Sequence, residues 1–218
     1  VIGQETTGAA GFSFAMRSIP VLLDYCVYAK KYAKPDVKIF NFTNPAGLVS
    51  QALSFAGVDC AYGICDAPTS MLASFAELLS VPSDEVYGEV FGLNHLSFFN
   101  SITVNGKEIL PKLIEADVAY ERTDLRYFDR ELLRKKQLIP NEYLYYYYSR
   151  ERAFENINGA SETRGEQIAR LNKLMTAELS GKDIANDFNG CLKIFDKYYG
   201  MRENSYMASE TGVSRHTE

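Results

Sequence analysis

Hydrophobic and polar residues alternate in blocks along the first 80 residues of the chain. Short apolar runs rich in strand-forming residues are separated by longer segments in which apolar residues recur at helical spacing. The predicted strands are 37–42 and 59–65, after the end of a strand at 1–4, and the predicted helices are 12–33, 48–56 and 69–79. Such alternation is typical of a parallel sheet covered by helices, and it predicts an α/β fold with part of a doubly wound sheet.

The pattern changes after residue 80. Residues 86–99 are predicted to be extended, and Asn105-Gly106 between two apolar runs predicts a hairpin, because both residues accept the positive φ of a tight turn. From residue 111 onward the chain is mostly helical in pattern and rich in charge, with breaks at 139–141 and 159–161. We therefore expect a boundary between residues 65 and 80, followed by a mixed α+β domain.

Composition narrows the possible partners. The chain has 218 residues, 46% hydrophobic and 23% charged, with a net charge of -5 and no basic block, which argues against nucleic acid. No apolar run reaches the roughly 18 residues of a membrane span. The four cysteines lack the spacing of a disulfide framework, so we expect free thiols, a reducing compartment and a cytoplasmic protein. The sequence contains neither a GxGxxG nor a Walker motif.

Three polar clusters follow predicted strands, at 4–7, 41–44 and 65–66. Ligands of open parallel sheets bind beyond the carboxyl ends of the strands, so we expect these clusters to meet at one edge. Cys65 lies in the third cluster, and His95 lies toward the far end of the next extended segment. The other histidine of the chain is His216. A thiolate and an imidazole are suitable ligands for a divalent metal.

Each of these residues also has a simpler interpretation. A free cysteine is commonly a small buried hydrophobe, and a histidine can be a hydrogen-bonded core residue. The polar neighbours Asp66 and Asn94 favour a site, in which Asn94 would contact the substrate. Arg164 suits either a surface salt bridge or a substrate phosphate.

Five tyrosines lie close together, Tyr143 and the run 145–148. Their spacing fits an aromatic helix face that packs on the sheet. A tyrosine can also act as a base where a nearby metal or cation lowers its pKa. The spacing alone does not distinguish among the five rings.

Five motifs occur in one order and at fitting intervals. The motifs are GQETTG at 3–8, NFTNPAG at 41–47, GICDAP at 63–68, GLNHL at 92–96 and IPNEYL at 139–144. Together they resemble glycoside hydrolase family 4, the NAD- and divalent-metal-dependent 6-phosphoglucosidases, from residue 1 to about residue 212, and they look closest to the 6-phospho-β-glucosidase branch.

The resemblance implies the remainder of a Rossmann-like NAD-binding domain at 1–70. It implies an α+β catalytic domain like that of lactate and malate dehydrogenases at 71–218. We expect the chain to be a fragment that lacks the N-terminal NAD fingerprint and the last helices, and that is inactive by itself. The family also implies a phosphorylated disaccharide or glucoside as substrate and a homodimer or homotetramer at full length.

The resemblance further implies a redox route to hydrolysis, without the paired carboxylates of most glycosidases. The sugar is oxidised at C3 with NAD+ as hydride acceptor, while a divalent metal, usually Mn2+, polarises the C2 and C3 oxygens. A tyrosinate removes the C2 proton, the C1 leaving group departs, water adds, and hydride returns to C3.

Positions of this chain that match the family motifs acquire expected roles. Cys65 and His95 match the metal ligands, and Tyr143 matches the catalytic base. The remaining matches are Asp66 as an acid or substrate contact, Asn44 at the sugar and the nicotinamide, Glu5 near substrate and cofactor, and Arg164 at the sugar phosphate.

The sequence leaves alternatives for the anomer that the enzyme would accept and for the activity of the protein. Cys65-Asp66 resembles phospho-α-glucosidases, since many phospho-β members have asparagine after the cysteine. Residues 92–97 and 139–148 look closer to a phospho-β branch that also carries Cys-Asp, and we expect β. A 2-hydroxyacid dehydrogenase on the same fold is a rival, although it would not need Cys65. A non-catalytic sensor of sugar phosphate or NAD and an inactive truncated product are two further hypotheses.

Overall fold

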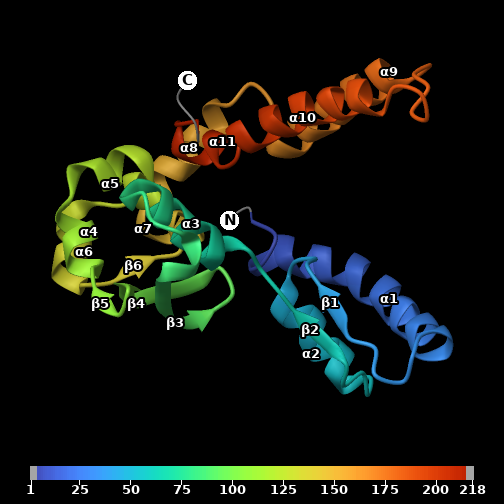
Figure 1. Cartoon of the computed structure of the whole chain (residues 1–218), viewed down its shortest axis with the longest axis horizontal. Coiled ribbons are helices and arrows are strands. Elements are labelled where there is room, and N and C mark those ends of the chain that lie inside the picture. The colour runs from blue at the N-terminus through green and yellow to red at the C-terminus, as the bar shows by residue number, and fades with distance from the viewer. Residues whose placement is uncertain (1–3, 215–218) are drawn as a thin grey trace. The chain divides into compact units, whose positions relative to one another are not determined.

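The computed structural model describes residues 4–214, and contacts divide the chain into two units, Val1–Leu144 and Tyr145–Glu218. The expected strand end at residues 1–3 lies outside the described residues. The first unit begins with a helix, a strand, a helix, a strand and a helix (Figure 1). These are α1 (Gly8–Tyr32), β1 (Ile39–Asn41), α2 (Ala46–Phe55), β2 (Ala61–Gly63) and α3 (Ala67–Leu79).

The strands β1 and β2 pair in parallel, with Ile39 opposite Ala61 and Asn41 opposite Gly63. The helices α1 and α2 pack with these strands around an apolar core that contains Cys26, Val49 and Leu53, each at most 1% exposed. The helix α1 ends with Lys30 and Lys31 in its last turn, where positive charge stabilises the helix dipole. The alternation of parallel strands and helices predicted for this part of the chain is confirmed.

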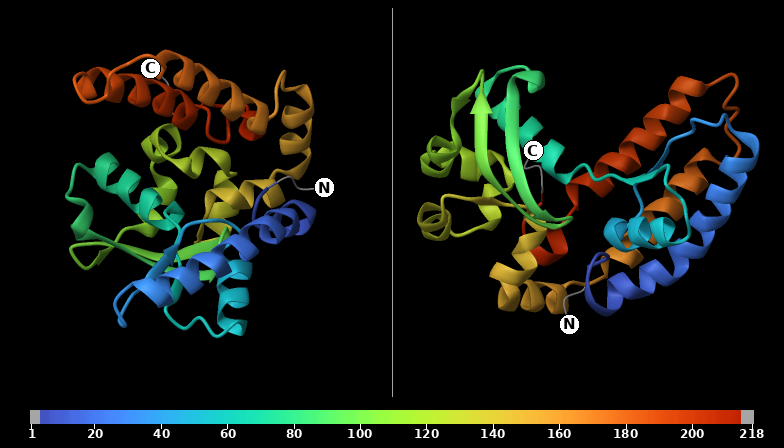
Figure 2. Two further views of the ribbon diagram at one scale, coloured as in Figure 1. Left: turned by 90° about the vertical axis from the view of Figure 1, so that its right-hand side faces the viewer. Right: turned by 90° about the horizontal axis from the view of Figure 1, so that it is seen from below.

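The rest of the first unit is built on an antiparallel sheet. Figure 2 shows its two long strands as a hairpin. The strands are β3 (Val86–Leu93), β4 (Leu96–Val104), β5 (Lys107–Glu108) and β6 (Ile139–Pro140), and β4 pairs with each of the other three. The helices and 3-10 turns of this part are η1 (Ser83–Glu85), α4 (Leu110–Glu115), α5 (Asp117–Arg122), η2 (Asp124–Tyr127), α6 (Arg130–Lys136) and η3 (Glu142–Leu144).

The hairpin predicted at Asn105-Gly106 is confirmed, with φ of 50° and 73° at these two residues. Two other expectations need correction. Residues 86–99 do not form one extended segment, because the chain reverses at Asn94-His95 between β3 and β4. Residues 139–141 contain more than a helix break, since β6 pairs antiparallel with β4. Parallel strands followed by an antiparallel sheet and helices confirm the α/β class.

The second unit is helical. Its elements are α7 (Tyr145–Tyr148), α8 (Arg150–Gly159), α9 (Arg164–Leu179), α10 (Phe188–Asn204) and α11 (Ala208–Thr211). The helices α9 and α10 lie side by side (Figure 2), and α11 packs on α8. A capping box in which Thr163 and Glu166 exchange hydrogen bonds starts α9. Within residues 4–214, every helix is too short or too polar to span a lipid bilayer.

The structure does not test the domain boundary expected near residue 70. The division at Leu144 follows the packing of the chain, whereas the expected division separates two parts of the first unit. The two-domain organisation therefore stays a prediction.

Candidate active site

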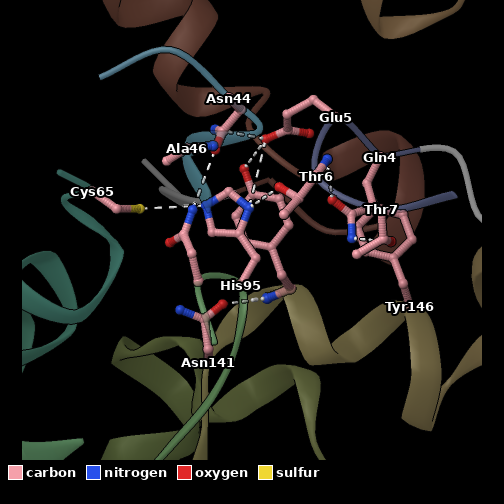
Figure 3. A network of polar contacts seen from close by, with 12 residues as sticks. Gln4, Glu5, Thr6, Thr7, Asn44, Ala46, Cys65, His95, Asn141 and Tyr146 are labelled. Carbon is pink, nitrogen blue, oxygen red and sulfur yellow. Dashed lines mark hydrogen bonds and ion pairs between the residues drawn. The ribbon is translucent and has the colours of Figure 1, made fainter. Parts of the chain in front are cut away.

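Residues from five separate segments of the first unit meet at one place (Figure 3). Each segment is a loop or a turn next to a strand or helix, as expected for groups held at the edge of a sheet. The residues are Glu5 and Thr6 before α1, Asn44 after β1, Cys65 between β2 and α3, Asn94 and His95 between β3 and β4, and Tyr143 in η3.

The thiol of Cys65 and the imidazole of His95 are in direct contact. Cys65 Sγ lies 3.3 Å from His95 Nε2, and His95 is 2% exposed. His95 is brought there by the tight hairpin turn, in which its φ is 61°. Gly92 makes the turn possible, because its φ is 115° and a Cβ at this position would collide with the carbonyl oxygen of Leu96.

Burial determines the charge state of both groups. It raises the pKa of the Cys65 thiol, an effect that the amide of Ala67 opposes. It also lowers the pKa of the His95 imidazolium, although Glu5 and Asp66 act in the other direction. Both groups are therefore neutral near pH 7 in the protein alone. A neutral imidazole is the form that binds a metal, and a coordinating thiol loses its proton to become a ligand.

The donor set fits a metal that also binds other ligands. Within residues 4–214, no group of three or more His, Cys, Asp or Glu side chains is arranged to hold a metal ion. A sulfur and an imidazole nitrogen in contact would provide two protein ligands and would leave the other coordination positions to water or substrate. Open positions distinguish catalytic metal sites from closed structural ones.

The phenol of Tyr143 is part of the same cluster. Its ring stacks on the His95 imidazole, with ring centroids 3.6 Å apart, and its hydroxyl donates a hydrogen bond to Glu5 Oε1 at 2.7 Å. Asn141 fixes the start of η3, because its side-chain oxygen accepts the backbone N–H of Tyr143 at 3.0 Å. The phenolic oxygen is therefore held beside the thiol–imidazole pair.

Two asparagines extend the network from Glu5. Asn44 Nδ2 donates to Glu5 Oε1 at 3.5 Å, and Asn94 Nδ2 donates to Asn44 Oδ1 at 3.3 Å. Asp66 is exposed at the start of α3 and acts on His95 and Cys65 through its charge. The structure thus groups seven of the eight expected site residues in the first unit.

Arg164, the eighth residue, belongs to the second unit. Its guanidinium donates to Gln167 Oε1 and Ser205 Oγ, both at 2.6 Å, and to the carbonyl oxygen of Arg202 at 2.9 Å. Burial lowers its pKa, and the neighbouring Arg202 lowers it further. Arg164 is therefore held by α9 and α10, and its expected role at a phosphate stays a prediction.

Sequence analysis assigns no individual role to two residues that hold the site, Thr6 and Asn141. Thr6 Oγ1 forms a 2.6 Å hydrogen bond with His95 Nδ1, and Asn141 holds Tyr143. Thr6 directly follows Glu5 in the motif at 3–8, and Asn141 lies two residues before Tyr143 in the motif at 139–144. Their positions close to expected site residues are the signal in the sequence that could have identified them.

Comparison with known proteins gives two family matches and a set of relatives. Residues 1–81 match the model of "Family 4 glycosyl hydrolase", and residues 90–211 match "Family 4 glycosyl hydrolase C-terminal domain". The 6-phospho-beta-glucosidase BglT of Thermotoga maritima is 30% identical over 79% of this chain and 41% of its own length. The phospho-alpha-glucosidase PagL of Clostridium acetobutylicum is 29% identical over 84% of this chain and 45% of its own length.

A solved structure is also similar to this chain. The 6-phospho-beta-glucosidase of Thermotoga maritima, solved with manganese, NAD+ and glucose-6-phosphate, superposes with a TM-score of 0.71 at 27% identity. The match covers 93% of this chain and 48% of that one. The chain thus spans less than half the length of the relatives it matches here, which have either β or α specificity.

Proposed function

The chain belongs to family 4 of the glycosyl hydrolases, and on this premise we propose that its protein hydrolyses 6-phospho-β-glucosides with NAD+ and Mn2+. The observation that carries the proposal is the contact of Cys65 Sγ with His95 Nε2, beside a Tyr143 hydroxyl held by Glu5. A soft sulfur, an imidazole and a phenol in one cluster fit metal-assisted proton abstraction from a sugar. The solved relative with manganese, NAD+ and glucose-6-phosphate supports the cofactors and the substrate class.

In the proposed mechanism, Cys65 and His95 would hold the metal, which would supply Lewis-acid polarisation of the sugar hydroxyl oxygens. Tyr143 takes the proton from C2 of the sugar at its phenolic oxygen and later returns one there. Glu5 accepts the phenolic hydrogen bond in the resting protein and so orients that oxygen. Before it can act as a base, Tyr143 must lose its own proton, and the positive charge of a metal held by Cys65 and His95 would favour that loss.

The overall reaction is a hydrolysis without net oxidation. NAD+, when bound, would supply a reversible hydride acceptor for C3, and Tyr143 takes the C2 proton and returns one. The bond between C1 and the glycosidic oxygen breaks, and a water oxygen replaces the leaving group at C1. Asp66, exposed at the start of α3, is the proposed proton donor to that leaving group or a substrate contact.

The remaining roles concern binding. Glu5 and Asn44 are proposed to border the nicotinamide, because they share one hydrogen-bonded network with Tyr143. Asn44 and Asn94 are proposed to contact the sugar hydroxyls, and Arg164 its phosphate. The cytoplasmic location and the assembly as a dimer or tetramer stay predictions.

A 6-phospho-α-glucosidase is the second candidate, since a phospho-α-glucosidase is among the relatives and Asp66 follows Cys65 directly. Removal of the C2 proton permits elimination from either anomer, so the proposed chemistry does not discriminate. The family assignment supports both candidates over a 2-hydroxyacid dehydrogenase.

The decisive experiment is a paired assay of the full-length protein with NAD+, Mn2+ and a thiol reductant. Release of nitrophenol is compared for the 6-phospho-β-glucoside, the 6-phospho-α-glucoside and the unphosphorylated glucosides. We expect turnover of the β substrate that stops when NAD+ or Mn2+ is omitted. Turnover of the α substrate alone would establish the second candidate, and turnover of neither would contradict both.

A further inference from the structure

The two ring nitrogens of His95 have different partners. Nε2 faces Cys65 Sγ at 3.3 Å, and Nδ1 faces Thr6 Oγ1 at 2.6 Å (Figure 3). The proposed mechanism uses the first contact and leaves the second without a role. A hydrogen bond this short, to a ring that is 2% exposed, restricts how the ring can sit.

The chemistry of imidazole indicates which atom donates the hydrogen bond between His95 Nδ1 and Thr6 Oγ1. A neutral imidazole carries one hydrogen, on one of its two nitrogens, and its other nitrogen has a free lone pair. A metal ligand must present that lone pair, so a metal at Nε2 requires the hydrogen on Nδ1. The partner of Nδ1 must then accept a hydrogen bond, which a hydroxyl oxygen can do.

Glu5 is the other candidate for this partner, and its distance argues against it. Glu5 Oε1 lies 3.9 Å from His95 Nδ1, beyond the range of a hydrogen bond. The same oxygen already accepts the Tyr143 hydroxyl at 2.7 Å. Thr6 therefore contacts the imidazole, and its neighbour Glu5 contacts the phenol stacked on it.

The backbone of Thr6 is itself held in place. Its N–H donates to Gln4 Oε1 at 2.8 Å, and Gln4 is 3% exposed. The first turn of α1 packs directly against it, since a Cβ at Gly11 would lie 2.5 Å from the carbonyl carbon of Thr6. This close approach leaves little freedom for the threonine to move away from the ring.

We propose that Thr6 is a positioning residue for His95, whose side-chain oxygen accepts the Nδ1 hydrogen and keeps the Nε2 lone pair directed at Cys65. The inference rests on the proposed metal-binding role of Cys65 and His95. Residues that orient a metal-bound histidine through its second nitrogen typically change metal affinity ten- to a hundredfold when removed. Thr6 would therefore set the metal affinity without touching the metal.

The first test measures the tautomer without any metal. The full-length protein is labelled with 15N and 13C at histidine, and the imidazole signals that disappear in a His95→Gln variant are those of His95. We expect His95 to carry its hydrogen on Nδ1, and Thr6→Val to shift the population toward Nε2. A hydrogen on Nε2 in the unchanged chain would overturn the proposal.

The second test measures Mn2+ affinity by titration calorimetry in the full-length protein. Thr6→Val, which removes the hydroxyl at nearly constant volume, should weaken binding roughly ten- to a hundredfold. Thr6→Ser, which keeps the hydroxyl, should bind nearly as tightly as the unchanged protein. Melting temperatures close to that of the unchanged protein would show that both variants are folded.

The possible outcomes separate the two proposals. Equal Mn2+ affinity in Thr6→Val and the unchanged protein would overturn the role of Thr6 and leave the metal site intact. Equal loss in Thr6→Val and Thr6→Ser would also overturn it, because the hydroxyl would not matter. Failure of the unchanged protein to bind Mn2+ would contradict the metal site, and the role of Thr6 with it.

Discussion

The imidazole of His95 lies flat against the phenol ring of Tyr143, with ring planes 10° from parallel. Each ring also has a polar anchor in the segment before α1, Thr6 for the imidazole and Glu5 for the phenol. The stack therefore fixes the position of an imidazole nitrogen relative to that of a phenolic oxygen. Any change that moves one ring is expected to disturb the other.

Replacing Cys65 by serine should weaken Mn2+ binding and abolish metal-dependent turnover, because a hydroxyl is a much poorer ligand than a thiolate. The loss of affinity should exceed the roughly ten- to hundredfold effect of a supporting residue. Mn2+ titration and the glucosidase assay provide the measurements. Cys60→Ser is the matched control, since Cys60 is a free, half-buried cysteine that packs on the α1–α2 core. Full activity of Cys65→Ser would refute its assignment as a ligand.

Replacing Tyr143 by phenylalanine should remove exchange of the substrate C2 hydrogen with solvent while the fold survives. The ring stack on His95 can persist, but the phenolic oxygen that takes the proton is gone. We expect turnover to fall roughly 10²- to 10⁴-fold, the usual contribution of a general base. Deuterium incorporation at C2 measures the step directly. Tyr87→Phe, at an exposed tyrosine of β3, serves as the control, and exchange that continues in Tyr143→Phe would refute Tyr143 as the base.

Replacing Gly11 by alanine should destabilise the protein and lower its Mn2+ affinity. Alanine usually stabilises a helix by about 1 kcal/mol relative to glycine. Here the new Cβ would lie 2.5 Å from the Thr6 carbonyl carbon and 2.6 Å from its oxygen, so α1 or Thr6 must shift. Overpacking of this kind costs about 1–3 kcal/mol. Denaturant unfolding and Mn2+ titration measure the two effects.

Gly200→Ala in α10 is the matched control for Gly11→Ala. Nothing lies within 4 Å of a Cβ at Gly200, so the substitution should gain about 1 kcal/mol of stability. If both substitutions stabilise the protein equally, the contact between Gly11 and Thr6 has no energetic consequence.

Glu108 should make the stability of the first unit depend on pH in the acid range. Burial acts to raise its pKa, but hydrogen bonds from Ser101 Oγ and from the amides of Leu110 and Ile102 outweigh it, so the net pKa is lowered. A carboxyl with a lowered pKa stabilises the fold above its unfolded value of about 4.3, and this contribution disappears as pH falls through the folded pKa.

Urea unfolding between pH 6 and pH 3 tests this prediction. Glu108→Gln should lower stability slightly at pH 6, because a neutral amide accepts hydrogen bonds less strongly than a carboxylate, and should flatten the fall in stability toward pH 3. Glu89→Gln on β3 removes one negative charge from the same sheet and is the control. Identical pH profiles of the unchanged protein and Glu108→Gln would contradict the assignment.

Local signals account for the parts of the fold that could be predicted. Helical spacing in residues 12–79 and the Asn105-Gly106 turn both lie in the sequence itself, because periodicity and positive φ are local properties. The turn at Asn94-His95 carried no such signal. A residue other than glycine seldom adopts positive φ, and the glycine that relieves the turn, Gly92, lies before it rather than in it.

Some contacts of the candidate site could likewise be predicted from the sequence, and others could not. Cys65 and His95 could be chosen because polar residues after strands tend to meet, and the contact at 3.3 Å agrees with that reasoning. The hydrogen bond from Tyr143 to Glu5 joins residues 138 positions apart, and no local pattern encodes such a pairing. The contact of Thr6 with His95 depends on how closely α1 approaches the loop before it, which only the packing at Gly11 reveals.

The backbone conformation of His95 lowers the stability of the hairpin but places the imidazole that the proposed activity needs. A residue with a Cβ in the left-handed region, as His95 is at φ 61°, costs roughly 1–2 kcal/mol, and asparagine tolerates that region better. A chain selected only for a robust hairpin would therefore place asparagine or glycine at this position. Directed evolution for heat resistance without an activity screen should accordingly replace His95 early, discarding the imidazole on which the proposed chemistry depends.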